Sequence, residues 1–258
     1  MKPQLLIREV TVQDLDVIRG LYFDVWGYNR PASFDRWRFF SNPLGLCPAV
    51  LATIGDQPVG FYTIWPTKIK LRNEVLFGGQ SMDTMTHPSY QGQGIFGELA
   101  NACYELAGDK GYQVLYGFPN SLSYPGFTGS LEWQHTGDIT HWVRPIRPSG
   151  HPRVPTVLGP IVDFISDCFP KGATSGINIR IEKPSSRDLV AQLKFWFERN
   201  SKIRISRTPD WLEWRYAEVT ENDYEWICAY RGDSLSAFGV WGMQNNIWSN
   251  VADSRAHL

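Results

Sequence analysis

The stretch Ser81–Leu99, SMDTMTHPSYQGQGIFGEL, decides the fold of this 258-residue chain. Its first part, up to Thr86, predicts a β-strand, and its last part predicts a helix that begins at Ile95. The turn between them, Gln91–Gly94, contains two glycines, which leave the backbone accessible because they carry no Cβ. A helix start also presents unpaired N–H groups with partial positive charge. The turn is therefore either a phosphate-binding loop or a plain connector, and the flanking segments decide between the two.

The residues before this stretch predict a strand, two helices and a run of antiparallel strands. Apolar residues at helical spacing follow a capping-box pair, Thr11 and Asp14. A turn at residues 55–58 separates two apolar runs and predicts a hairpin. In chain order the predicted strands are Leu5–Ile7, Ala49–Ile54, Val59–Ile69 and Val75–Thr86, and the helices precede Gly27 and span Trp37.

The residues after the stretch complete an alternation of helices and strands. The helix that begins at Ile95 carries apolar residues along one face up to Leu106. Gln113–Phe118 predicts a buried strand, and a short helix is expected around Tyr124–Leu131. Trp133–Val143 alternates well enough to supply one or two final strands.

Composition excludes several classes of protein. The formal net charge of −1 gives no field toward nucleic acid, and no run of 18 apolar residues suggests a membrane span. The four cysteines lie far apart without a CxxC pair, so neither a disulfide framework nor a metal site is expected. The N-terminus lacks the apolar core of a signal peptide. We therefore expect a cytoplasmic α/β protein that binds no metal.

The C-terminal part repeats the first part weakly. Residues 144–176 hold six prolines and predict a linker. From residue 177 to 258, three anchors recur at a fixed offset of 177 positions. They are Trp214-Arg215-Tyr216 for Trp37-Arg38-Phe39, Gly232-Asp233 for Gly55-Asp56, and Phe238 for Phe61. The second copy has no counterpart of the glycine turn, so we expect one phosphate loop only.

This order of elements, with QGQGIF after the fourth strand, resembles the GNAT superfamily of acyl-CoA-dependent N-acyltransferases. The family signature is Gln or Arg, two residues, Gly, one residue, then Gly or Ala. Gln91 and Gly94 match it and Phe96 departs from it. Downstream, the segments FPN at Phe118–Asn120 and LEW at Leu131–Trp133 also resemble the family. The resemblance covers residues 1–143 and extends weakly to 177–258 as a partial second unit.

The resemblance implies an α/β fold with a mixed, mostly antiparallel twisted sheet and flanking helices, joined to a smaller, truncated GNAT-like α+β half. It implies that acetyl-CoA is the co-substrate. The pyrophosphate would lie over the backbone of six residues, and the pantetheine arm would run along the fourth strand. The loop residues are Gln91, Gly92, Gln93, Gly94, Ile95 and Phe96, and the wedge between the fourth and fifth strands would be lined by Met85, Thr86 and Asn120.

Direct attack by an amine on the thioester needs a neutral amine, hence a base or a water path, and an acid for the thiolate. Asp83, on the fourth strand beside the loop, is the candidate base, with His87 as an alternative. The family commonly places an acid tyrosine at the position that Thr128 occupies here. An aliphatic hydroxyl is a far weaker acid than a phenol, so Tyr124, the nearest tyrosine, is the candidate acid, with water as the alternative.

The sequence therefore predicts an N-acetyltransferase that acts on a primary amine of a small molecule. The C-terminal half is expected to cover the acceptor side or to form a homodimer interface. Two alternatives stay open. The missing tyrosine at Thr128 suits a non-catalytic module that binds or senses acyl-CoA. A tandem aminoacyl-transferase of the peptidoglycan cross-bridge type is less compatible with a good CoA loop.

Overall fold

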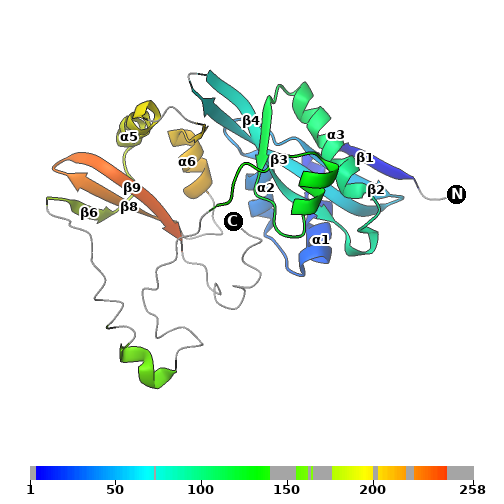
Figure 1. Ribbon diagram of the computed structural model, residues 1–258, viewed down its shortest axis with the longest axis horizontal. Helices are drawn as coiled ribbons and strands as arrows, with labels where there is room; N and C mark the ends of the chain where they lie inside the picture. Colours follow the sequence, from blue (N-terminus) through cyan, green and yellow to red (C-terminus); the bar gives the residue numbers. More distant parts are fainter. Residues whose placement is uncertain are drawn as a thin grey trace.

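The computed structural model describes residues 4–72, 74–139, 155–161, 164, 176–199, 203–218 and 224–242. Within these residues the chain forms two sheets that lie side by side along the long axis of the molecule (Figure 1). The larger sheet comes from the N-terminal half, with one short strand added from the C-terminal half. No helix in the described ranges has the length and apolar character needed to cross a membrane.

The larger sheet is mixed, as predicted. Its central path runs in the order β1-β2-β3-β4-β5, and every pair along this path is antiparallel except β4 and β5, which run parallel. The strands are β1 (Leu5–Glu9), β2 (Ala49–Ile54), β3 (Gln57–Leu71), β4 (Glu74–Thr86) and β5 (Val114–Gly117).

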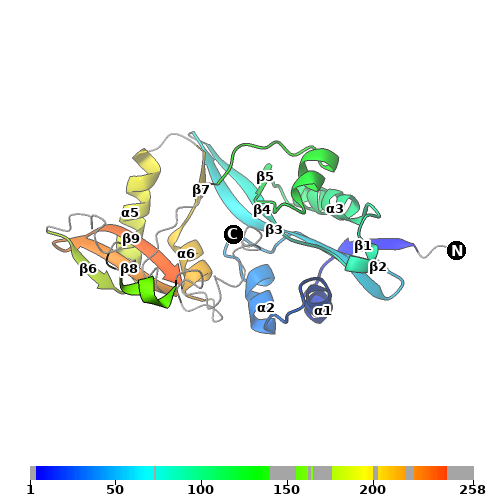
Figure 2. The same ribbon diagram turned by 60° about the horizontal axis from the view of Figure 1, so that its bottom comes forward.

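Helices cover both faces of this sheet (Figure 2). Side chains alternate across a strand, so successive residues of β2 enter different cores. Val50 and Ala52 pack beneath α3 (Ile95–Asp109), whereas Leu51 packs beneath α1 (Leu15–Trp26). The second helix on the α1 face is α2 (Ala32–Phe40).

Gly60 permits the close approach of α3 to β3. A Cβ at this position would lie 2.5 Å from Leu99 Cδ1, which is too short for a real contact. Leu99 is 1% exposed and belongs to the core beneath α3. The glycine therefore fixes the depth at which α3, and with it the start of the helix, sits on the sheet.

The smaller sheet has the order β6-β8-β9 and is antiparallel. Leu189 and Leu212, from the two helices of this half, pack together with Trp226 of the sheet in one apolar core. The elements are β6 (Asn178–Ile181), α5 (Ser186–Arg199), α6 (Pro209–Tyr216), β8 (Tyr224–Arg231) and β9 (Ser234–Gly242).

Two local details recur between the halves at the offset of 177 positions. The turns of the two hairpins each hold a glycine with φ +58°, Gly55 and Gly232. A register shift falls at Ala52/Thr53 in β2 and at Ala229/Tyr230 in β8. Left-handed turns and bulges interrupt a ladder at specific residues. Their presence at equivalent positions of the two halves therefore supports the predicted repeat. That the second half is a partial GNAT-like unit stays a prediction.

The two halves share a strand that the sequence analysis missed. The strand β7 (Arg204–Ser206) leaves the C-terminal half and pairs antiparallel with Lys68–Lys70 of β3. β3 extends beyond β2 on this side, so its edge is open to β7. The C-terminal half therefore completes the sheet of the N-terminal half through backbone hydrogen bonds.

A tryptophan pair joins α2 to α6 beside this strand. The rings of Trp37 and Trp214 stack with centroids 5.0 Å apart, and Trp214 is 1% exposed. Trp37 Nε1 donates to the Trp214 carbonyl oxygen at 2.8 Å, and Trp214 Nε1 donates to the Trp37 carbonyl oxygen at 3.4 Å. The two residues are equivalent in the predicted repeat, so the contact is a reciprocal one between corresponding positions.

Some expectations fall differently or outside the described ranges. Residues 133–139 form no strand, which corrects the prediction for the first part of Trp133–Val143. Trp133 instead packs its ring against Phe127, with centroids 4.8 Å apart. Residues 140–143, most of the predicted linker at 144–176, and residues 243–258 lie outside the described ranges.

Candidate functional site

The turn between β4 and α3 presents a row of backbone N–H groups. Gly92 has φ +75° and Gly94, at the N-cap of α3, has φ +83°. A Cβ at either position would meet no atom within 4 Å, so the space in front of the turn is open. Among the described residues, no hydrogen-bond acceptor lies against the N–H groups from Gly92 to Phe96. Such a row at a helix start suits a pyrophosphate.

The side chains around the turn hold its backbone. Gln91 Nε2 donates to the Thr86 carbonyl oxygen at 3.2 Å, and Gln93 Nε2 donates to the Ser89 carbonyl oxygen at 3.5 Å. Ile95 is 4% exposed and belongs to the core beneath α3. Phe96 packs against the ring of Phe127, with centroids 5.4 Å apart. Ile95 and Phe96 therefore offer a ligand their backbone N–H groups.

The fourth and fifth strands pair for only four residues. Gly78–Ser81 of β4 pairs with Val114–Gly117 of β5, and β4 then continues to Thr86 without a partner on that side among the described residues. The end of β4 beside the turn therefore has a free edge. Such an edge can accept an extended chain through backbone hydrogen bonds.

The side chain of Met85 does not line this wedge. It is 3% exposed and packs with Leu21 and Phe61 in the core beneath α1. This corrects the expectation that its side chain faces the thioester, and only the backbone of Met85 is available on the free edge. Thr86 contributes a carbonyl oxygen, which Gln91 already engages.

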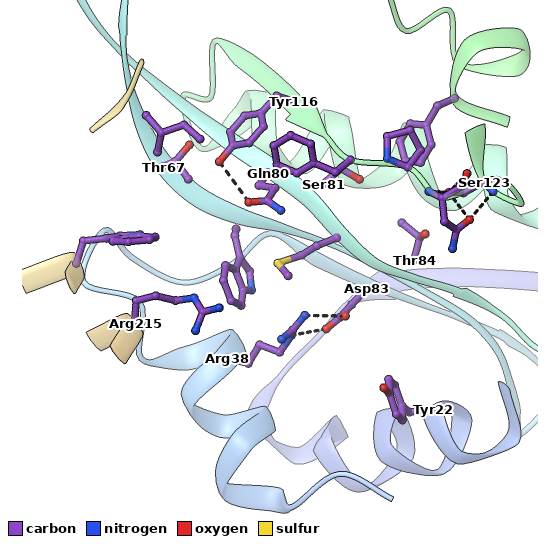
Figure 3. Close-up of a pocket in the computed structure, with 18 of the residues that line it drawn as sticks. Tyr22, Arg38, Thr67, Gln80, Ser81, Asp83, Thr84, Tyr116, Ser123 and Arg215 are labelled. Atoms are coloured by element: carbon purple, nitrogen blue, oxygen red, sulfur yellow. Dashed lines mark hydrogen bonds and ion pairs between the residues drawn. The ribbon is translucent and has the colours of Figure 1, made fainter. Parts of the chain in front are cut away.

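A bulge in β4 places Asp83 in an unusual conformation. The register of β3 and β4 shifts between the pairs Thr63/Met82 and Phe61/Met85, so Asp83 and Thr84 together oppose Tyr62. Asp83 has φ +49°, which is uncommon for a residue with a Cβ. The bulge turns the Asp83 side chain toward α2 (Figure 3).

Two arginines hold the Asp83 carboxylate. Arg38 binds it in a bidentate manner, with Nε to Oδ2 at 2.6 Å and Nη2 to Oδ1 at 2.9 Å, and Arg30 Nη1 lies 3.1 Å from Oδ2. Burial raises the pKa of Asp83, but the attraction of Arg38 and Arg30 outweighs it and lowers the pKa below its ordinary value. A carboxylate with a lowered pKa is a weak base. The geometry therefore favours Asp83 as a charge anchor over the base role expected from the sequence.

A second carboxylate completes the charge cluster. Asp35 is fully buried, and its Oδ1 lies 2.8 Å from Nη2 of Arg30. Burial raises the pKa of Asp35 to about 6, against the attraction of Arg30. The cluster of Arg30, Arg38, Asp35 and Asp83 holds two cationic and two acidic groups, so its charges balance when all four are ionised.

Tyr124 lies at the margin of the site. Its hydroxyl is 2.9 Å from His135 Nδ1, and the side chain is 39% exposed. His135 Nε2 in turn lies 3.4 Å from Asp138 Oδ1. Thr128 Oγ1 donates to the Tyr124 carbonyl oxygen at 3.0 Å. The predicted acid is thus the first member of a chain of polar groups that ends at the surface.

Asn120 lines a cavity beside the wedge between β4 and β5, and it also orders the loop after β5. Its Oδ1 accepts from the N–H groups of Leu122 at 3.0 Å and Ser123 at 2.9 Å. Ser123 Oγ also lies 3.1 Å from Asn120 Oδ1. This arrangement is an Asx turn, which fixes the direction of the chain opposite β4.

A cavity of about 490 Å³ lies beside the wedge and is lined by residues of both halves (Figure 3). From the N-terminal half, β4 contributes its residues 80–84, and α1 contributes Tyr22 and Trp26. The C-terminal half contributes Ile205, Arg207, Trp211, Arg215 and Tyr216. Within the described residues, no group of three His, Cys, Asp or Glu side chains is arranged to hold a metal ion.

The part of this cavity that the C-terminal half supplies was not predicted from the sequence. Arg215 lies beside Trp214, which marked the repeat, but that signal concerned duplication only. Trp26 of α1 and Trp65 of β3 also line the cavity. Ile205 and Arg207 reach it because β7 joins β3, and a three-residue strand leaves too short a pattern to be read from sequence.

Comparisons with known proteins agree with this fold. A family model described as an acetyltransferase (GNAT) domain matches residues 6–136. No curated protein sequence matches the chain significantly. Among solved structures, a probable N-acyltransferase of unknown function from Enterococcus faecalis V583 is 12% identical with a TM-score of 0.61. The match covers 93% of this chain and 56% of that protein.

Saccharomyces cerevisiae N-myristoyltransferase with bound myristoyl-CoA is 13% identical with a TM-score of 0.58, and 93% of this chain covers 58% of it. The chain thus spans slightly more than half the length of these two proteins, and at such identities the likeness concerns the fold. The family model covers half of the chain and includes the strand, the glycine turn and the helix. The chain therefore belongs to the GNAT acetyltransferase family.

Proposed function

We propose that the chain transfers an acetyl group from acetyl-CoA to a primary amine of a small molecule. The observation that carries this proposal is the row of N–H groups from Gly92 to Phe96, placed directly after the edge of β4; neither the row nor the edge has a partner within the described residues. The row suits the pyrophosphate, and the edge beside Met85 and Thr86 suits the amide groups of the pantetheine arm. The cavity lies where that edge meets β5 and has room for a small acceptor.

The proposed reaction is a direct attack. The amine nitrogen forms a bond to the thioester carbon, the carbon–sulfur bond breaks, and the thiolate takes up a proton. The amine also loses a proton, and since Asp83 is ion-paired to Arg38 and Arg30, we assign this step to water in the cavity. Tyr124 is our candidate for the acid that protonates the thiolate.

A loop variant tests the cofactor site. Gly94→Val is expected to weaken acetyl-CoA binding at least about tenfold. Such a loss corresponds to only about 1.4 kcal/mol of binding free energy. At φ +83° an L residue is strained, and the new side chain would occupy the open space before the N–H row. Titration calorimetry with acetyl-CoA measures the effect.

Gly111→Val is the matched control, because Gly111 ends the same helix with φ +84° and equally open surroundings. It imposes similar backbone strain far from the turn, so we expect it to leave the affinity for acetyl-CoA unchanged. Equal losses in both variants would show that the N–H row does not bind the pyrophosphate. Absence of acetyl-CoA binding by the unaltered chain would refute the proposed function itself.

A hydroxyl deletion tests the acid. Tyr124→Phe is expected to slow release of the CoA thiol about 10²-fold on a panel of primary amines, with acetyl-CoA affinity unchanged. The ring contact with His135 is kept, since the ring centroids lie 5.7 Å apart, while the hydroxyl is removed. Tyr112→Phe removes a hydroxyl outside the cavity and serves as the control. An unchanged rate in Tyr124→Phe would assign the proton to water.

One observation favours a second function, the binding of acyl-CoA without transfer. The Tyr124 hydroxyl is engaged by His135, and Tyr124 is not among the residues that line the cavity. A module of this kind would bind acetyl-CoA and release no thiol with any amine of the panel. The same two measurements therefore separate the two functions.

A further inference from the structure

The end of the cavity formed by β7 and α6 carries positive charge that no carboxylate of its described lining residues balances. Three arginines line the cavity, Arg38, Arg207 and Arg215, whereas Asp83 is the one carboxylate among the lining residues. Asp83 is already bound by Arg38. Two positive charges therefore remain, and both come from the C-terminal half.

Arg215 is held by neutral groups and directed into the cavity. It lies on α6, and Figure 3 shows its side chain pointing toward the space between α2 and β4. Its guanidinium lies 5.1 Å from the ring centroid of Tyr216, and Nη1 donates to the Tyr224 hydroxyl at 3.3 Å. These contacts orient the planar group without cancelling its charge.

Arg207 follows β7 directly, so the pairing of β7 with β3 fixes its backbone. Its guanidinium lies 5.7 Å from the ring centroid of Trp211. In the described part of the chain, neither Arg207 nor Arg215 has an Asp or Glu oxygen within ion-pair distance. Arginines that line a cavity without a carboxylate partner suit a ligand that brings its own negative charge.

This charged end lies far from the predicted pyrophosphate loop. β7 pairs with Lys68–Lys70, and this part of β3 pairs with Val75–Phe77 of β4. The loop begins beyond Thr86, at the other end of β4. Nine residues of strand separate the two ends, which corresponds to about 30 Å at 3.3 Å per residue. The two positively charged regions are therefore distinct, and the cavity lies between them.

We infer that Arg207 and Arg215 form an anion subsite for the acceptor, which carries a carboxylate or phosphate in addition to its primary amine. The inference rests on the proposed function insofar as it names the acceptor class. Trp65, Trp211 and Tyr216 line the same end and supply apolar surface for the body of such a molecule. The bound anion would leave the amine to reach toward the wedge between β4 and β5.

Pairs of amines that differ only in the anion test the subsite by calorimetry on the full chain. Glucosamine 6-phosphate is compared with glucosamine, and alanine with 2-amino-1-propanol. We expect the anionic member of at least one pair to bind about tenfold more tightly, with the advantage shrinking as salt is raised. The pair with the larger difference identifies phosphate or carboxylate as the bound group.

Arg207→Gln and Arg215→Gln are each expected to remove most of this advantage. Arg36→Gln is the control, because Arg36 is exposed on α2 and does not line the cavity. Arg215→Lys keeps the charge without the planar fork and is expected to retain part of the preference. Thermal unfolding checks that each variant is folded, and Arg207 is exposed enough for its replacement to be tolerated.

If neither anionic amine binds better than its neutral partner, or if the preference survives when Arg207→Gln and Arg215→Gln are combined in one chain, the subsite is refuted. Acetyl-CoA binding is measured in the same samples. Absence of an anion preference in the unaltered chain, with acetyl-CoA binding intact, would refute this inference alone. An intact anion preference in a chain that does not bind acetyl-CoA would refute the proposed function and leave the subsite standing.

Discussion

Asp83→Ala is expected to lower the free energy of unfolding by about 3–5 kcal/mol, since removal of one partner leaves buried charges uncompensated. The side chains of Arg30 and Arg38 are only 7% and 17% exposed, so water cannot replace the carboxylate fully. Asp35 would still face Arg30, whereas Arg38 would lose both of its charged hydrogen bonds. Chemical denaturation followed by circular dichroism measures the change.

Asp16→Ala provides the matched control, because Asp16 pairs with Arg19 at 3.2 Å but its side chain is 84% exposed. Exposed pairs of this kind contribute at most about 1 kcal/mol. A loss in Asp83→Ala no larger than in Asp16→Ala would contradict the anchor role. If Asp83 were instead the catalytic base, Asp83→Asn would abolish thiol release while the affinity for acetyl-CoA stayed unchanged.

Trp214→Ala is expected to cost about 3–5 kcal/mol of stability, in the range of other buried aromatic deletions. The ring is 1% exposed and stacks on Trp37 at 5.0 Å, with Trp65 5.2 Å away on another side. Its loss leaves a cavity between the two halves and removes the donor to the Trp37 carbonyl oxygen. Because the contact joins the halves, we also expect unfolding to separate into two transitions.

Trp241→Ala is the control for this variant, since Trp241 lies on β9 and is 41% exposed. Its replacement is expected to change the free energy of unfolding by less than about 1 kcal/mol. Trp214→Phe keeps most of the ring volume and should recover part of the loss. A single, unshifted transition in Trp214→Ala would show that the halves are held together without the tryptophan pair.

Short sequence patterns predicted the parts of the fold that depend on residues close together in the chain. The strand before Thr86, the glycine turn and the start of α3 at Ile95 follow from periodicity, left-handed glycines and helix-start chemistry within 20 residues. The hairpin at Gly55 follows from its turn residues in the same way. These segments need no distant partner to be recognised, and the structure and the family match confirm them.

The role of Asp83 could not be read in this way. Its partner Arg38 is 45 positions away in sequence. The bulge that gives Asp83 a φ of +49° contains no glycine or proline that would indicate it in the sequence. The same bulge reverses the alternation of side chains, which is why Met85 points into the core. The placement of both side chains thus has one cause, a single extra residue in β4.

The three-residue strand β7 limits how far the segment after it can move relative to the N-terminal half. Because Lys68–Lys70 hold it in the sheet of the N-terminal half, the segment that carries Arg207 cannot swing away without breaking a β-ladder. β3 and β7, which are more than 130 positions apart in sequence, thus form one rigid wall of the cavity. For the proposed amine acceptor, we expect selection to depend on the fit of the molecule to a preformed cavity, not on closure of one half upon the other.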